Sequence, residues 1–143
     1  MGAELRGVGA GVYDRWTALW NGELRLAAEI MAPEFTLRYA QAGTEVFDEV
    51  RTPERLAEVI AQWRAMRGPG LRFEAEGVAV ADLEPAGGTV SGLVARPYRA
   101  SFVDADGAVV ARSGTDTLRI TDGLITEVWS VSSGAAGRTF YPG

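Results

Sequence analysis

The hydrophobic pattern of the chain changes period once, near residue 71, and this change limits the possible folds more than any other feature. Before it, apolar residues recur every three or four positions, which is the spacing of one helix face. After it, they alternate with polar residues, as in strands whose side chains point to opposite faces. The turn signals EPAGG, DADG and TDG divide this part into strands expected at residues 71–83, 89–103, 108–120 and 124–132. Helices followed by an antiparallel meander predict an α+β fold.

Three helices and one short strand are expected in the first half of the chain. The first helix ends at Asn21-Gly22, the second ends at Pro33, and a strand follows at residues 35–39. Thr52 as N-cap and Pro53 at the first helical position predict the start of the third helix. The apolar face of the first helix is formed by Val12, Tyr13, Trp16, Leu19 and Trp20.

Length and charge limit the class of protein. The 143 residues predict a single domain over residues 1–143, with a core from about 9 to 132, a flexible N-terminus and a flexible C-terminal tail at 133–143. A formal net charge of −5 argues against nucleic acids and anionic membranes as partners. No apolar run approaches the roughly 20 residues of a membrane span, and no secretory signal pattern is visible. We therefore expect a cytoplasmic protein without a nucleic-acid or membrane partner.

Three residue types are missing, and their absence narrows the available chemistry. The chain has no cysteine and no histidine, and all fourteen of its basic residues are arginine. Thiolate nucleophiles, histidine bases, lysine Schiff bases and the usual zinc ligands are therefore excluded. Carboxylates, phenols, hydroxyls and arginines remain. We expect no metal site and no cofactor.

An acid occupies an unexpected place in the last predicted hairpin, GTDTLRITDGLITEVWS, residues 114–130. Asp116 alternates with Leu118 and Ile120, so all three point to one face of the strand. If that face is the interior, a carboxylate is turned inward. Perturbed acids of this kind mark functional sites, although structural pairs produce them too.

The closing hairpin also carries a family resemblance. Together with the helix segment RWTALWNGEL, the strand EFTLRYA and the helix start TPERLAEVI, it resembles the nuclear transport factor 2-like superfamily. The resemblance is greatest to the SnoaL-like, polyketide cyclase-like branch of small bacterial proteins, and it covers about residues 9–132. The family pattern D-x-F-R-x-x-D-G-K-I-x-E-x-W is matched here by Asp116, Leu118, Arg119, Asp122, Gly123, Leu124, Ile125, Glu127 and Trp129.

This resemblance implies a cone-shaped, curved antiparallel sheet wrapped around three N-terminal helices, a cystatin-like arrangement with a conical pocket. It also implies a homodimer formed through the outer sheet face. Strand 89–103 fits both expectations, because its two alternating sets of side chains are both partly apolar. One set contains Val90, Val94, Tyr98 and Phe102, and the other contains Leu93, Ala95 and Val103.

Residue by residue, the resemblance transfers only part of any known active site. In ketosteroid isomerases, which belong to the superfamily, the aspartate matching Asp116 is kept protonated and donates a hydrogen bond to the oxyanion. The tyrosine of that enzyme's first helix corresponds to Trp16, and its general base corresponds to Arg38 or Tyr39. The Asp-Arg-Asp set of limonene epoxide hydrolases and the E-H-W-D of many SnoaL-like proteins are incomplete here. The stretch 127–130 reads E-V-W-S.

Two functions follow from these residues. The first is a small cofactor-independent enzyme for cyclisation, isomerisation or dehydration of an apolar carbonyl compound, with Asp116 transferring the proton. Arg38, or the Trp16 indole, would hold the substrate oxygen. The second is a non-catalytic module of the same fold that binds a hydrophobic ligand or dimerises. In that case Asp116 caps a backbone group or pairs with Arg38, Arg96 or Arg112.

The remaining candidates concern the pocket wall and its entrance. Aromatic residues on helix stripes and strand faces usually form core, but some are expected to line a pocket for a flat ligand. The acids Glu45, Asp48 and Glu49 are expected in a solvated loop that can act as a lid. The expected substrate-binding residues are Tyr13, Trp16, Trp20, Tyr39, Trp63, Tyr98, Phe102, Leu118, Val128 and Ser130.

Overall fold

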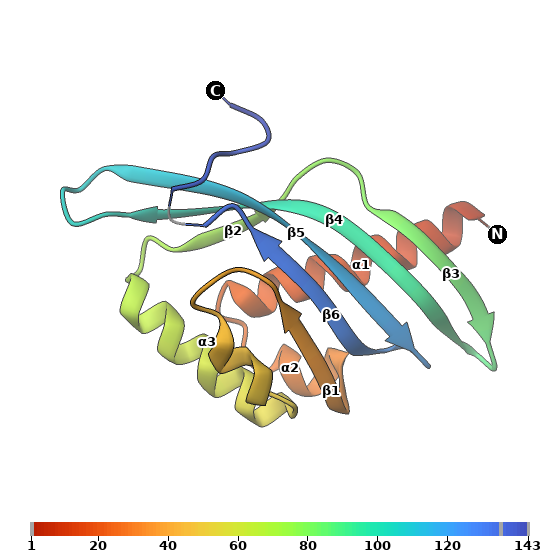
Figure 1. Ribbon diagram of the computed structural model, residues 1–143. Coiled ribbons are helices and arrows are strands. Elements are labelled where there is room, and N and C mark those ends of the chain that lie inside the picture. Colours follow the sequence, from red (N-terminus) through yellow and green to blue (C-terminus); the bar gives the residue numbers. More distant parts are fainter. Residues whose placement is uncertain (1, 135, 143) are drawn as a thin grey trace.

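A computed structural model describes residues 2–134 and 136–142 and confirms the α+β class. Helices pack on one face of a curved sheet, as Figure 1 shows. The helices are α1 Gly2–Trp20, α2 Leu26–Ile30, the 3₁₀ helix η1 Glu45–Glu49 and α3 Pro53–Arg67. The strands are β1 Met31–Tyr39, β2 Arg72–Ala75, β3 Val80–Ala86, β4 Thr89–Val103, β5 Val109–Thr121 and β6 Leu124–Ser132. No helix of the described residues is long and apolar enough to cross a membrane.

The sheet has the order β1-β6-β5-β4-β2, and β3 pairs with β4 as well. The pairs among β2 to β6 are antiparallel, as the turn signals predict. The pair of β1 with β6 is parallel, so the sheet is mixed and the prediction of a purely antiparallel sheet is wrong at this edge. Parallel neighbours need a long crossover. Here η1 and α3 carry the chain from β1 to the opposite edge (Figure 1).

The single strand expected at residues 71–83 is interrupted between β2 and β3. Glu76 donates its backbone N–H to the carbonyl of Pro97 at 2.9 Å, but Pro97 has no N–H to return. The side chain of Arg96 binds the exposed carbonyls instead, with Nε 3.2 Å from Glu76 O and Nη2 2.8 Å from Gly77 O. Gly77 has a φ of 63°, which breaks the extended run.

Both ends of the described chain make tertiary contacts. The first helix begins at Gly2, and Gly9 lies so close to β3 that a Cβ there would be 2.9 Å from Ala81 Cβ. After β6, the carbonyl of Arg138 accepts the backbone N–H of Ser113 at 3.0 Å. The N–H of Phe140 donates to Ser113 Oγ at 2.9 Å, so the described tail lies along β5.

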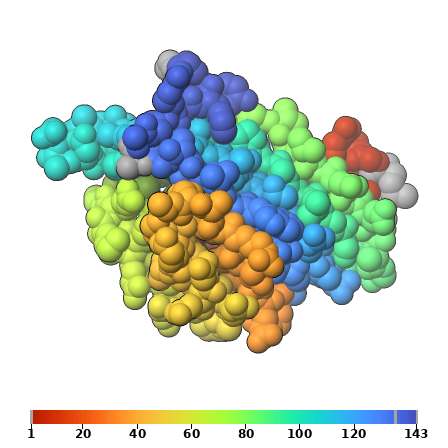
Figure 2. All heavy atoms as spheres, viewed as in Figure 1, coloured from red at the N-terminus to blue at the C-terminus, as the bar shows by residue number. Residues whose placement is uncertain are grey.

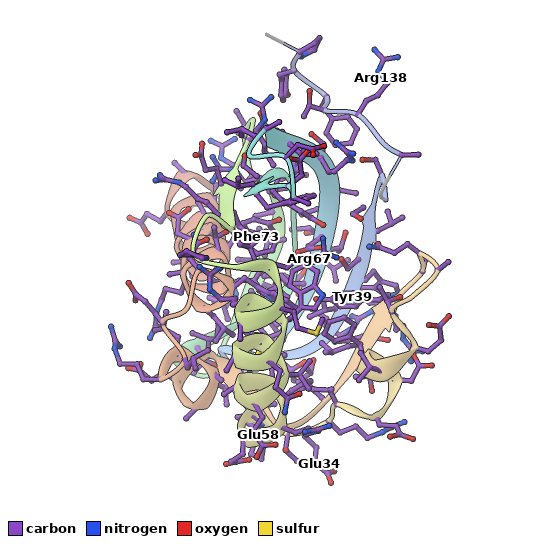
Figure 3. All side chains as sticks on the ribbon, turned by 90° about the vertical axis from the view of Figure 1, so that its left-hand side faces the viewer. Glu34, Tyr39, Glu58, Arg67, Phe73 and Arg138 are labelled. Carbon is purple, nitrogen blue, oxygen red and sulfur yellow. The ribbon has the colours of Figure 1, made fainter. Side chains whose placement is uncertain are left out.

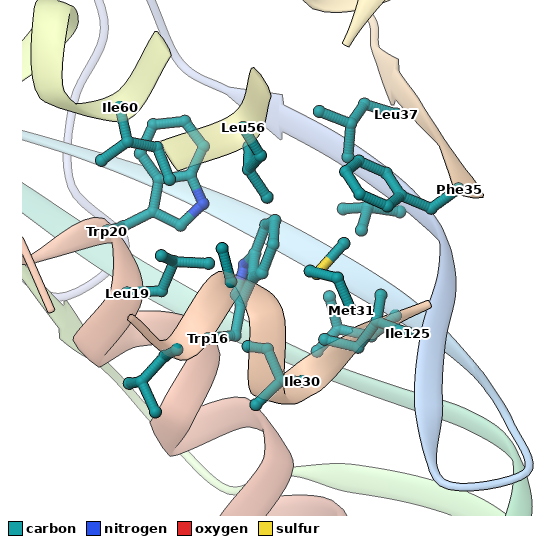
Figure 4. Close-up of a cluster of buried hydrophobic side chains, with 14 of the residues drawn as sticks. Trp16, Leu19, Trp20, Ile30, Met31, Phe35, Leu37, Leu56, Ile60 and Ile125 are labelled. Atoms are coloured by element: carbon teal, nitrogen blue, oxygen red, sulfur yellow. The ribbon is translucent and has the colours of Figure 1, made fainter. Parts of the chain in front are cut away.

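The core fills one end of the space between helices and sheet. Figure 4 shows Leu56 and Ile60 of α3 facing Trp16 and Trp20 of α1, and Ile125 of β6 is fully buried in the same cluster. Along the inner face of each long strand, aliphatic side chains are followed by a side chain that carries a polar group. In β5 Ile120 and Leu118 are followed by Asp116, in β6 Val128 is followed by Ser130, and in β4 Val94 is followed farther along by Tyr98.

Candidate active site

A cavity of about 480 Å³ occupies the other end of this space. It lies where α1 and α3 end, and its walls come from β1, β4, β5, β6 and the loop after β1. β4 has 15 residues and α3 also has 15. A strand rises about 3.3 Å per residue against about 1.5 Å for a helix, so the strands outreach the helix. Figure 2 shows the cyan tip of the β4–β5 hairpin projecting beyond α3.

Asp116 lies at the boundary between the packed core and this cavity. Its side chain lines the cavity although only 7% of the residue is exposed. The Trp16 indole Nε1–H donates to Oδ2 at 2.9 Å, which fixes the orientation of the carboxyl group. Oδ1 is buried and has no hydrogen-bond partner of normal geometry among the described residues. One oxygen is therefore held by a hydrogen bond, and the other is buried without one.

The pKa of Asp116 is raised from the ordinary 3.8 to about 6. Burial is the cause, because an ionised carboxylate loses its hydration there. Ser130, which faces Asp116 across the β5–β6 ladder, and the Trp16 indole stabilise the charged form and lower this pKa in part. Among the described residues no ion pair includes Asp116. The group therefore changes protonation near neutral pH, where a general acid–base catalyst is most effective.

Two phenols, Tyr39 and Tyr98, stand in the cavity wall near this carboxyl group. Burial raises the pKa of both, and the charge of Asp116 raises it further, so both phenols keep their protons and can donate hydrogen bonds. Gly114 makes room for the phenol of Tyr98. A Cβ at residue 114 would be 2.5 Å from the hydroxyl oxygen of Tyr98, so the Tyr98 ring can lie against β5 only because residue 114 is glycine.

The rest of the wall is mostly aromatic and is organised around Trp20. Its ring centroid lies 5.7 Å from that of Trp63 and 5.8 Å from those of Phe47 and Phe73. Tyr39 stacks on Phe47 with 4.4 Å between centroids. Flat aromatic walls of this kind favour a flat apolar ligand.

Arg67 lies at the rim, with its guanidinium carbon 4.9 Å from the Trp63 centroid and 5.4 Å from the Phe102 centroid. Figure 3 looks onto α3 and shows Phe73, Arg67 and Tyr39, which line the cavity, near the middle of the view. Glu34 and Glu58 lie at its lower edge. The cavity lining therefore combines aromatic surface with two arginines, Arg67 and Arg112.

Comparison with known families agrees with this geometry. The sequence profile of the SnoaL-like domain matches residues 12–128. The chain belongs to the SnoaL-like domain family. This confirms the resemblance to the SnoaL-like branch of the nuclear transport factor 2-like superfamily. A comparison with curated protein sequences gives no match.

Solved structures similar to this SnoaL-like protein share its fold at low sequence identity. One is a protein from Acidithiobacillus ferrooxidans that is provisionally named a polyketide cyclase, with 14% identity, 87% of each chain covered and a TM-score of 0.65. Another, from Bacillus cereus and similarly named, has 19% identity and a TM-score of 0.62, covering 87% of this chain and 74% of that one. A Xanthomonas campestris protein of unknown function with a cystatin-like fold has 18% identity, a TM-score of 0.64 and coverage of 91% and 98%.

The SnoaL-like cavity contains some of the predicted binding residues but not all of them. Four of the ten, Tyr13, Trp16, Leu118 and Val128, lie in the packed core and do not line the cavity. Tyr13 donates its hydroxyl to the carbonyl of Arg96 at 2.9 Å, and burial raises its pKa. The alternation of side chains identifies the inner face correctly, but it does not say how deep along that face each residue lies. The six that line the cavity are Trp20, Tyr39, Trp63, Tyr98, Phe102 and Ser130.

Arg38 does not face the cavity, so its predicted place beside the substrate oxygen is wrong. In β1, Leu37 is buried and Tyr39 lines the cavity, which places Arg38 between them on the outer face. Its side chain is 56% exposed and forms an ion pair with Glu127. Hydrogen bonding from Arg38 lowers the pKa of Glu127, and Arg119 binds the same carboxylate at 3.2 Å.

The other two arginines considered as partners of Asp116 are engaged elsewhere. Arg96 pairs with Asp14 at 3.5 Å in addition to the carbonyls of residues 76 and 77. Arg112 donates from Nε to the carbonyl of Gly134 at 3.1 Å. Among the described residues, Asp116 on the inner face of β5 therefore forms no closed ion pair with an arginine.

The loop after β1 supplies cavity residues that the sequence did not single out. Phe47 is buried, whereas the neighbouring acids Glu45, Asp48 and Glu49 are exposed, as expected. All four lie in the short 3₁₀ helix η1 and not in an irregular loop. Gln41 ties this loop to β6 through two 2.7 Å hydrogen bonds with Ser132. A lone phenylalanine among acids, F in TEVFDE, was the available sign that one side of this loop is covered.

Proposed function

We propose that this protein is a cofactor-independent enzyme that moves a proton at the carbon next to a carbonyl group of a flat, largely apolar molecule. A cyclisation of the polyketide type is the reaction class that fits best. One observation carries the proposal. Oδ1 of Asp116 is buried at the floor of an aromatic cavity and lacks a hydrogen-bond partner among the described residues. The provisional polyketide cyclase names of two structural relatives point in the same direction.

In the proposed step, the ionised Asp116 acts as base through Oδ1. The α-carbon loses its proton to Oδ1, the C–H electron pair forms the enolate double bond, and the carbonyl π pair moves to oxygen. That oxygen accepts a hydrogen bond from the phenol of Tyr39 or Tyr98, both of which keep their protons. The enolate carbon then attacks a second carbonyl of the same molecule. The new alkoxide takes the proton back from Asp116, so the product is an isomer of the substrate and no redox partner is needed.

A non-catalytic ligand-binding module is the second candidate. An apolar cavity lined by Trp20, Trp63 and Phe73 is compatible with that role. The enzyme is favoured because a binding module has no need of a cavity-lining carboxyl group whose pKa is about 6 and whose Oδ1 has no partner among the described residues.

Hydrogen–deuterium exchange tests the proposal without knowledge of the natural substrate. 2-Tetralone, a bicyclic ketone with acidic α-protons, is incubated with the protein in D₂O at pH 7.5, and the loss of its α-proton signal is followed by NMR. We expect exchange above the buffer rate, and a decrease of about 10²-fold or more in Asp116→Asn, the range typical of one acid–base group. Asp106→Asn, at the exposed β4–β5 turn, is the matched control and should exchange as the wild type does.

Two results would overturn the proposal. One is an Asp116→Asn variant that exchanges at the wild-type rate. The other is a wild type that exchanges no faster than buffer with 2-tetralone and with open-chain aryl β-diketones, which would leave the binding module as the function.

A further inference from the structure

The charged residues of the cavity lining are separated along its length. Asp116 lies at the floor, and Arg112 lies on the same face of β5, four residues nearer the tip of the β4–β5 hairpin. At about 3.3 Å per residue, their Cα atoms are about 13 Å apart along the strand. Arg67, in the last turn of α3, is the third charged residue among the described residues of the lining. The floor therefore carries an acid, and the rim carries two cations.

The guanidinium of Arg67 is positioned by aromatic rings and has no polar partner among the described residues. Its carbon lies 4.9 Å from the Trp63 centroid and 5.4 Å from the Phe102 centroid. In the described part of the chain, no ion pair or hydrogen bond of its side chain accompanies these two contacts. Arg64, about one turn earlier, donates instead to two backbone carbonyls. A guanidinium stacked on rings keeps the N–H donors of its plane for an incoming acceptor.

The position of Arg67 also has an explanation that involves no ligand. A cation in the last turn of a helix interacts favourably with the helix dipole, and Arg67 is the last residue of α3. This stabilisation is the same whichever molecule enters the cavity. A test of the rim must therefore compare ligands of different charge, and not variants alone.

The rim is basic although the protein as a whole is acidic. The formal net charge is −5, and the exposed acids of η1, Glu45, Asp48 and Glu49, do not line the cavity. An anion is therefore repelled by most of the surface and attracted at the rim. At the floor it would face the carboxylate of Asp116, and the repulsion of like charges opposes that orientation. The favoured orientation places an anionic group at the rim and the apolar body along the aromatic walls.

We propose that Arg67 determines specificity by selecting ligands that carry a carboxylate at one end and by holding that end at the rim. An arginine can bind both oxygens of a carboxylate through two parallel N–H···O hydrogen bonds. Arg112 adds positive charge to the same part of the wall. The inference rests on the proposed function and deepens it, because a substrate held by its carboxylate at the rim has its opposite, apolar end directed toward Asp116.

The test compares two ligands of the same shape that differ in charge. 2-Naphthoate and 2-naphthamide are titrated into the protein by isothermal calorimetry at pH 7.5 and low ionic strength. We expect the wild type to bind 2-naphthoate about fivefold more tightly than 2-naphthamide, the upper value for one solvent-exposed ion pair. In about 0.5 M NaCl this preference should fall below about twofold, because salt screens exposed charges.

Two variants separate the role of Arg67 from the general charge of the helix. Arg67→Gln keeps a polar side chain without the charge, so it should bind the two ligands equally. Arg55→Gln is the matched control. It removes the same charge from the same helix, but Arg55 pairs with Glu58 and does not line the cavity, so the fivefold preference should remain. Equal affinities of the wild type for the two ligands, or the same change in both variants, would overturn the inference.

A measurement on the wild type covers the case in which the Arg67 variant does not fold. In a ¹H–¹⁵N spectrum, 2-naphthoate should move the assigned Nε–H resonance of Arg67 downfield, and 2-naphthamide should not. Equal effects of the two ligands on that resonance would contradict the assignment of the carboxylate to Arg67.

The proposed function can fail separately. If binding depends on the carboxylate and on Arg67 but no α-proton exchange occurs, the enzyme proposal falls and the rim site stands. If exchange depends on Asp116 but the wild type does not prefer 2-naphthoate, the reaction stands and the role assigned to Arg67 is wrong.

Discussion

Replacing Asp116 with asparagine should make the folded protein more stable at pH 8 and change its dependence on pH. The carboxyl group has a folded-state pKa of about 6 against 3.8 ordinarily, because burial penalises its charge. Between these two pH values the folded chain holds a proton that the unfolded chain has released. Wild-type stability therefore falls as pH rises through this window, and it stays low above it.

The size of the effect follows from the two pKa values. Their difference is about two, and each pKa unit corresponds to about 1.4 kcal/mol, so full ionisation of Asp116 costs about 3 kcal/mol of folding free energy. Asparagine has nearly the same shape and stays neutral at every pH. Its side-chain oxygen can still accept the hydrogen bond that Trp16 Nε1 donates to Oδ2 at 2.9 Å.

The assay is urea unfolding followed by tryptophan fluorescence at half-unit steps from pH 4 to pH 8, for wild type and Asp116→Asn. The free energy of unfolding of the variant minus that of the wild type should grow by about 2.5 kcal/mol from pH 4 to pH 8, with most of the change below about pH 6.5. Other titrating groups drop out of this difference. Glu127, whose pKa is lowered by hydrogen bonding from Arg38, is the main one, and both proteins contain it.

A flat difference across this range would refute the reasoning, because it would mean that the carboxyl group titrates alike in the folded and unfolded chains. A difference that shrinks as pH rises would be a stronger contradiction. It would require the folded state to stabilise the Asp116 charge, as a close arginine partner does.

Three further outcomes follow from the geometry. Gly114→Ala should destabilise the fold by about 1–3 kcal/mol in urea unfolding, because its Cβ would be 2.5 Å from the Tyr98 hydroxyl oxygen; an unchanged midpoint would contradict the packing described for Tyr98. Arg38→Gln should leave 2-tetralone exchange at the wild-type rate and cost less than about 1 kcal/mol, since the ion pair with Glu127 is on the exposed outer face; a tenfold loss of exchange would return Arg38 to the site. We also expect a homodimer, as the family resemblance implies, so light scattering should give twice the 15.2 kDa of one chain, and a single-chain mass at micromolar concentration would contradict this.

The parts of the fold that depend on local signals could be predicted from the sequence. The period of two and the turn residues define the β4–β5–β6 meander, and Asp122 and Gly123 adopt the positive φ values, 50° and 84°, that their turn requires. The parallel pair of β1 with β6 could not be predicted in this way, because no turn joins those strands. The interruption between β2 and β3 at residues 76–79 could not be predicted from the local sequence, because it depends on Pro97, which lies on the neighbouring strand.

The sequence predicted which face of each strand the site residues occupy, but not whether each of them lies in the packed core or in the cavity wall. Alternation places Asp116 on the inner face with Leu118, and this is where both lie. Whether an inner residue meets packed side chains or open space depends on how helix and strand lengths match, and no single residue encodes that. The same limit explains why Val128 was expected in the cavity wall and lies in the core, while Ser130, two residues later, does line the cavity.

The energetics of Asp116 bear on whether its role is structural. A structural acid normally gains from its charge, through an ion pair or several donors, and its pKa is then lowered. Asp116 has one hydrogen bond of normal geometry, from Trp16 to Oδ2, and no ion pair among the described residues. Its charge costs stability above pH 6, although Ser130 and Trp16 offset part of the burial penalty. Asparagine would accept the same hydrogen bond without that cost. What asparagine cannot do is accept a proton from a bound ketone and return it. The feature that separates the two residues in this site is therefore reversible protonation, which a packing role does not use and the proposed reaction requires.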